Sequence, residues 1–152
     1  MAVDIDKNKV VIFSGAGISA ESGIRTFRDS DGLWNEYLIE EVASPKGWEV
    51  SPELVLQFYN ERRKEVCNSS PNSAHLAIAE LQSKFEVVVI TQNIDDLHER
   101  AGSRTVIHLH GEIIKARSSI DENRLYDIGG NPESERTACG HSYIYLIYND
   151  NA

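Results

Sequence analysis

The chain has 152 residues, of which 41% are hydrophobic and 26% are charged, and its formal net charge is −9. No apolar run is long enough to span a bilayer, and the acidic balance argues against nucleic acids and anionic membranes as general partners. The polar start, MAVDIDKNK, lacks the apolar segment of a secretory signal, so we expect a cytoplasmic protein.

A buried strand over residues 10–14 is the first predicted element. Val10 to Phe13 are β-branched or aromatic without alternation, which is typical of a strand covered on both faces of a parallel sheet. Gly15 permits a tight turn after it, and Gly17 leaves room for a pyrophosphate against bare backbone. The pattern therefore indicates a dinucleotide site, although an ordinary turn from strand to helix has the same glycines.

A mostly helical excursion is predicted next, over residues 36–70. Ser51 can cap its main helix, Pro52 suits the first turn, and apolar residues follow at helical spacing. Tyr59 and Arg62 are three residues apart and therefore share a helix face. From the residues alone, the plainer interpretation of ERRK is a solvated basic face.

A second helix, over residues 73–84, is predicted to return the chain to the sheet for a strand over residues 86–91. Polar residues gather at the carboxyl end of this strand, where open α/β sheets bind their ligands. They are Thr91, Gln92, Asn93 and Asp95. Asn93 or Asp95 would also suit a capping role for the helix that begins DDLHER.

The last predicted strand covers residues 105–110 and completes a βαβαβ unit. Its alternation places His108 and His110 on the same face, and Gly111 lets the backbone turn directly afterwards. Taken alone, His110 fits a hydrogen-bonded structural histidine better than a catalytic one. Three polar clusters at strand ends together favour a functional site.

Three of these segments resemble the signature blocks of the sirtuins, which are NAD-dependent protein-lysine deacylases. They are GAGISAESGIRTFR, TQNIDDLHERAG and HLHGE, in the order and at the approximate spacing of the family. The resemblance covers about residues 9–112 and looks closest to the bacterial deacylase subgroup. It implies an α/β fold, with a Rossmann-like parallel sheet, helices on both faces and a small helical excursion.

The resemblance also implies how NAD binds. Its pyrophosphate would lie at Gly15, Ala16 and Gly17, with Arg28 near the phosphates. Phe27 would cover the reactive sugar and exclude water.

The remaining roles implied by the family concern the reaction itself. The nicotinamide-ribose pocket would be lined by Gln92, Asn93, Ile94 and Asp95. His110 would be the general base on a ribose hydroxyl, a task that suits histidine because its side chain exchanges protons near neutral pH.

The partner implied by the resemblance is an acylated lysine side chain of a protein. In sirtuins that prefer acidic acyl groups, a Tyr-x-x-Arg pair lines the acyl-lysine pocket, and here that pair would be Tyr59 and Arg62. A guanidinium binds a succinyl or malonyl carboxylate bidentately. The products would be free lysine, nicotinamide and O-acyl-ADP-ribose.

The chain departs from the family in its cysteines. It has two, Cys67 and Cys139, and neither belongs to a C-x-x-C pair. Most sirtuins have two such pairs that bind a structural zinc, and tetrahedral zinc needs four good ligands. Cys139 and His141 supply two at most, so we expect no metal.

The chain also departs from the family in length. We expect residues 1–132 to be a partial sirtuin-type NAD-binding domain and residues 133–152 a divergent tail, in which YIYLIY can form a short strand. A partial sheet would leave an edge and an apolar face exposed, so we expect self-association.

Two other functions remain open from the sequence. One is a catalytically inactive fragment that binds NAD or ADP-ribose. The other is a conventional nucleotide-dependent oxidoreductase, which is disfavoured because no acidic residue clearly ends a second strand about twenty residues after the glycines.

Overall fold

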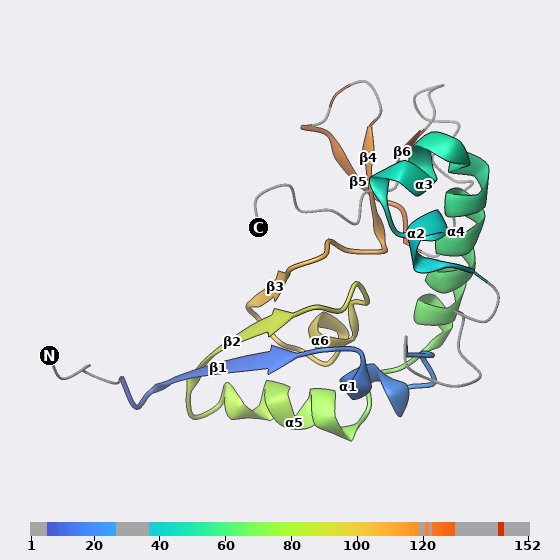
Figure 1. Ribbon diagram of the computed structural model, residues 1–152. Helices are drawn as coiled ribbons and strands as arrows, with labels where there is room; N and C mark the ends of the chain where they lie inside the picture. The colour runs from blue at the N-terminus through green and yellow to red at the C-terminus, as the bar shows by residue number, and fades with distance from the viewer. Residues whose placement is uncertain (1–5, 27–36, 119–120, 122, 130–142, 145–152) are drawn as a thin grey trace, which may run out of the picture.

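A three-stranded parallel sheet organises the computed structural model, which describes residues 6–26, 37–118, 121, 123–129 and 143–144 (Figure 1). The strands, in the order in which they are hydrogen-bonded, are β1 (Lys9–Ser14), β2 (Glu86–Thr91) and β3 (Val106–His108). Ser14 pairs with Thr91 and Thr91 with His108, so the three carboxyl ends share one edge. The parallel arrangement and the strands predicted at 10–14 and 86–91 are confirmed.

β3 is shorter than the strand predicted over residues 105–110. It ends at His108, and His110 lies beyond it in a bend before Gly111, whose φ is 80°. The expectation that both histidines share one strand face is therefore wrong. The alternation of TVIHLH continues beyond His108, where the pairing of the backbone with β2 ends.

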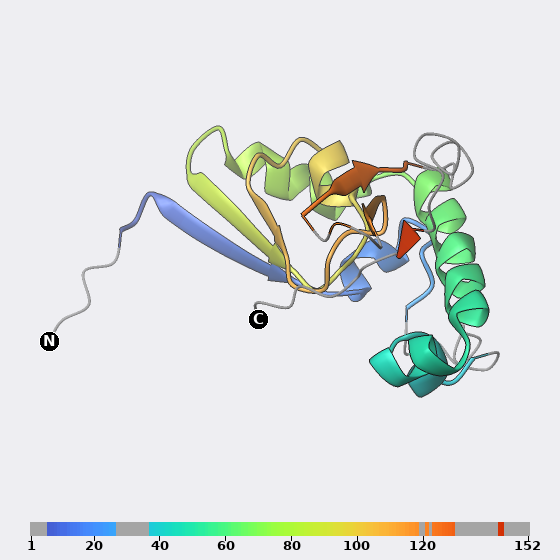
Figure 2. The same ribbon diagram turned by 90° about the horizontal axis from the view of Figure 1, so that it is seen from above.

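Two helices cover one face of the sheet. They are α5 (Ser73–Leu81) and α6 (Leu97–Arg100), and both lie on the same side of β1 and β2 (Figure 2). Val87 and Val89 are buried on this face. α5 ends three residues before the predicted boundary, because Gln82 forms its C-terminal cap.

The opposite face of the sheet is apolar and exposed. Val11 and Phe13 of β1 are 64% and 63% exposed, and Ile107 of β3 is 46% exposed. Val11 pairs with Val88, and Phe13 with Ile90, so these side chains continue one another across the sheet. A layer of helices was expected here as well.

The predicted helical excursion consists of α2 (Ile39–Val42), α3 (Pro45–Val50) and α4 (Pro52–Asn68), which stand together beside the sheet (Figure 1). A short helix, α1 (Gly17–Ala20), follows the glycine turn. Pro52 occupies the first turn of α4 as predicted. Ser51 occupies the predicted N-cap position of α4, but its side chain makes no capping hydrogen bond. Its backbone N–H closes α3 on the carbonyl of Gly47 at 2.9 Å.

A second, antiparallel sheet was not predicted, apart from a short strand within YIYLIY. It contains β4 (Lys115–Ser118), β5 (Leu125–Asp127) and β6 (Tyr143–Ile144), in the order β5-β4-β6. Its small core consists of Ala116, Ile128 and Tyr126. The sequence KARS of β4 has no apolar alternation, so nothing in it indicates a strand.

One hydrophobic core joins the helical layer to the loops of the parallel sheet. It contains Val55, Phe58 and Val66 of α4, Leu97 of α6 and Ile113 after β3. The buried side chain of Arg63 in α4 reinforces this contact, since its Nε donates to the carbonyl of Ile113 at 2.8 Å. Among the described helices, none has the length and apolar character needed to cross a membrane.

Candidate functional site

A pocket of about 380 Å³ lies between α4 and the loops that follow β1, β2 and β3. Because the strands are parallel, these loops converge at the carboxyl edge of the sheet, where open α/β sheets bind ligands. In α4 and in each of the three loops, residues singled out from the sequence line this pocket. They are Ala16, Tyr59, Arg62, Gln92, Asn93, Ile94, Asp95 and His110.

Ser19 joins two of these residues on the wall of the pocket. Its hydroxyl donates to Oδ2 of Asp95 at 2.9 Å and accepts from Nδ2 of Asn93 at 2.9 Å. Oδ1 of Asp95 also accepts from the backbone N–H of Leu97 at 3.2 Å, so Asp95 contacts the first residue of α6 as well as lining the pocket. All three polar side chains are buried, and their mutual hydrogen bonds hold an amide and a carboxylate at fixed positions.

Two buried histidines support the sheet beneath this wall. Nε2 of His98 lies 3.0 Å from the hydroxyl of Ser14, which donates to Thr91 at 2.9 Å. Nδ1 of His75 accepts from the backbone N–H of Asn72 at 3.3 Å in a capping box. Burial lowers the pKa of both imidazoles.

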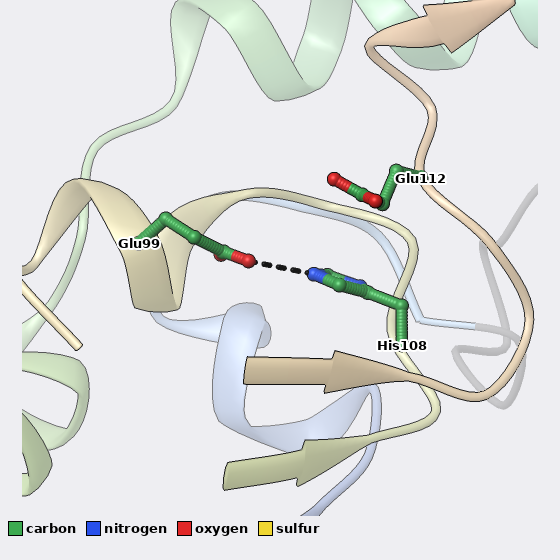
Figure 3. Close-up of side chains that lie close together, drawn as sticks. All are labelled: Glu99, His108 and Glu112. Atoms are coloured by element: carbon green, nitrogen blue, oxygen red, sulfur yellow. Dashed lines mark hydrogen bonds and ion pairs between the residues drawn. The ribbon is translucent and has the colours of Figure 1, made fainter. Parts of the chain in front are cut away.

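His110 is exposed and lines the pocket, whereas His108 lies behind the loop after β2. Nδ1 of His108 lies 2.8 Å from the carbonyl of Asn93, and Nε2 lies 2.8 Å from Oε1 of Glu99 (Figure 3). Both partners are acceptors, so these contacts favour the protonated ring, in which both nitrogens donate. Burial opposes its charge, but the hydrogen bonds to Glu99 and Asn93 outweigh burial and raise the pKa of His108.

Glu99, His108 and Glu112 form the described group with spacing suited to a metal ion, since their ligand atoms lie within 4.8 Å of one another (Figure 3). Lys115 holds Glu112 at 2.7 Å, and Glu99 binds His108 directly. These contacts are those of ion pairs. Cys139 and His141, the residues considered for zinc, lie outside the described residues.

Tyr59 and Arg62 both face the pocket from α4, and they are 8% and 6% exposed. Arg62 donates from Nη1 to Oε2 of Glu65 at 2.9 Å and from Nη2 to the carbonyl of Arg25 at 3.1 Å. Burial lowers its pKa, although Glu65 opposes the shift. The solvated basic face that ERRK suggested is therefore wrong for Arg62.

The glycine turn differs in detail from its prediction. Neither Gly15 nor Gly17 has a positive φ, so the turn does not require their conformational freedom. A Cβ atom at Gly15 would lie 3.3 Å from Oε1 of Gln92, while one at Gly17 would meet nothing within 4 Å. Space beside Gly17 fits the expected ligand. Phe27 and Arg28 lie outside the described residues.

Sequence reasoning missed part of the lining, namely Ser19, Ile24, Arg25, Ala43, Phe58 and Val66. Ser19 had a usable signal, since a serine among the residues that pack a helix on a sheet needs a polar partner. Arg25 and Val66 had none, because their place in the lining depends on how α4 packs against the glycine-turn segment.

Comparisons with known protein sequences identify relatives of this chain. The sequence model of the Sir2 family matches residues 15–141. An NAD-dependent protein deacylase of Helicobacter pylori is 59% identical over 117 residues, which are 77% of this chain and 51% of the relative. One from Pasteurella multocida is 48% identical over 136 residues, which are 86% of this chain and 58% of the relative. The chain thus spans about half the length of the curated relatives it matches.

Comparison of structures leads to the same group. A crystal structure of a Sir2 homologue in complex with NAD has a TM-score of 0.79 and 43% identity, and the match covers 93% of this chain and 57% of that one.

Proposed function

This chain belongs to the Sir2 family, and we propose that it acts in the NAD-dependent removal of acyl groups from protein lysines, giving nicotinamide and O-acyl-ADP-ribose. The observation that supports this most directly is the convergence of His110, Asp95, Asn93 and Tyr59 on one pocket from two loops and a helix. A Sir2 structure with a deacetylated p53 peptide and acetyl-ADP-ribose, 30% identical with a TM-score of 0.76, supports a protein lysine as the substrate.

The residues present fit the nicotinamide-ribose half of NAD. Asn93 and Asp95 are buried in the wall and held by Ser19, so their polar atoms are already oriented. The open space at Gly17 admits a phosphate close to the backbone. NAD, when bound, supplies the ribose that receives the acyl group as nicotinamide leaves.

We assign the proton transfer to His110. It is the histidine of this region that lines the pocket, and its exposed ring can meet a ribose hydroxyl there. His108 is unsuited, because both of its nitrogens are already engaged, one by the carbonyl of Asn93 and the other by Glu99. A general base needs a nitrogen that can accept a proton from the substrate.

The rest of the pocket assigned to the dinucleotide is lined by Gln92, Ile94 and Ala16. The roles of Phe27 and Arg28 in binding NAD stay predictions. Tyr59 and Arg62 are assigned to the acyl group. The phenol and guanidinium would both reach a succinyl or malonyl carboxylate from one turn of α4.

The test is to incubate the purified chain with NAD and acetylated or succinylated peptides and to search for O-acyl-ADP-ribose by mass spectrometry. Product is expected with the unaltered chain and at least a hundredfold less with His110→Ala, in line with about 10²–10⁴-fold for general acid–base catalysis. NAD binding without product would indicate a binding fragment. Reduction of NAD by a small alcohol would indicate an oxidoreductase.

A further inference from the structure

Glu65 holds together the two arginines that face the pocket. Its Oε2 accepts from Arg62 at 2.9 Å, and its Oε1 accepts from Nε of Arg25 at 3.2 Å. Both arginines belong to the lining, and Glu65 does not. A carboxylate of the protein therefore already engages the guanidinium of Arg62, from outside the residues that line the pocket.

The surroundings make this ion pair stronger than a surface one. The side chains of Arg62 and Glu65 are 8% and 20% exposed, so water screens their attraction only in part. The negative charge of Glu65 also offsets one of the two positive charges that Arg25 and Arg62 bring to the pocket. An incoming carboxylate meets a smaller attraction to the guanidinium and a repulsion from Glu65.

We propose that Glu65 is a specificity-determining residue, whose carboxylate competes with the terminal carboxylate of a dicarboxylic acyl group for the guanidinium of Arg62. The pocket is thereby shifted toward uncharged acyl groups, because an acetyl group meets neither the attraction nor the repulsion. This inference rests on the proposed function, since it concerns the acyl group taken by the same pocket.

Glu65→Gln is the informative substitution. Its amide oxygen still accepts from Arg62, so the guanidinium keeps a partner while the competing charge is lost. We expect the affinity for a succinyl-lysine peptide, divided by that for the matched acetyl-lysine peptide, to rise about fivefold, the upper range for one partly exposed ion pair. The affinities are measured by calorimetry on the full chain without NAD, so that neither peptide is consumed.

Glu61→Gln is the matched control, because Glu61 lies on α4 but is exposed and accepts from Gln57. Its ratio should equal that of the unaltered chain. If circular dichroism shows that Glu65→Gln does not fold, Glu65→Asp replaces it, since withdrawing the carboxylate by one methylene should raise the ratio about twofold.

The outcomes separate the two proposals. An unchanged or lower ratio in the folded Glu65 variant, with acetyl-lysine binding intact, overturns the role of Glu65 and leaves the proposed function standing. If the unaltered chain binds neither acylated peptide more tightly than the unmodified peptide, the proposed function fails and this inference fails with it.

Discussion

The hydroxyl of Ser19 holds the two side chains on which the proposed nicotinamide pocket depends. It donates to Asp95 and accepts from Asn93, and it is 1% exposed, so water cannot replace it. Its partners lie 74 and 76 residues away in the chain. The importance of Asn93 and Asp95 was predictable from a strand end, whereas the link to Ser19 is a product of tertiary packing.

Ser19→Ala should therefore destabilise the protein by about 1–3 kcal/mol, because a buried carboxylate and a buried amide each lose a hydrogen-bond partner. The free energy of unfolding in urea measures this. Ser83→Ala is the control, since Ser83 is exposed and donates only to a carbonyl at the end of α5, and it should change stability by less than about 0.5 kcal/mol. Equal effects of the two substitutions would contradict the account.

At the scale of elements, His108 is the point where β3, α6 and the loop after β2 meet. In its protonated form, the ring donates to the carbonyl of Asn93 in the loop and to Glu99 in α6. Because the pKa of His108 is raised in the folded protein, its contribution to stability is complete below the ordinary histidine pKa. It is lost as the pH rises through the folded pKa, when one of the two acceptors loses its donor.

His108→Gln should remove this pH dependence. The free energy of unfolding of the unaltered chain, minus that of the variant, is expected to fall as the pH rises from about 6 to about 9. Urea titrations at each pH measure the difference. His75 and His98 have lowered pKa values and so lose stability on the acid side of this range. A stability difference that stays constant, or that rises with pH, would contradict a stabilising charged form of His108.

Elements were predictable where apolar residues are periodic or continuous. The runs VVIF and VVVI led to β1 and β2, and Pro52 marked the start of α4. β4 was missed because its strand sequence is polar, and because β6, which pairs with it, is distant in the chain. The role of Glu65 was also out of reach, since it depends on Arg25 being folded against α4.

At the scale of the whole molecule, the exposed face of the parallel sheet has a consequence for association. Val11, Phe13 and Ile107 form an apolar surface across the strands, and β1 and β3 are the outer strands of the sheet. We therefore expect the chain to self-associate, as the partial sheet suggested. The molar mass should rise with concentration in size-exclusion chromatography with light scattering.

Phe13→Thr should weaken this association, because it removes the exposed aromatic ring and retains a residue that favours strands. Leu76→Gln is the control, since Leu76 is similarly apolar and 50% exposed but lies on α5. It should leave the association unchanged. A monomer at every concentration tested, or equal effects of both substitutions, would count against the sheet face as the contact surface.

In the function proposed above, His110 meets the ribose of NAD beside an acyl-lysine pocket lined by α4. The most direct measurement is a crystal structure of this chain with NAD and an acetyl-lysine peptide. We expect a ring nitrogen of His110 within hydrogen-bonding distance of a ribose hydroxyl, with the acyl group beside Tyr59 and Arg62. A structure in which the His110 ring points into solvent, or the dinucleotide lies away from Gly17 and Asn93, would contradict it.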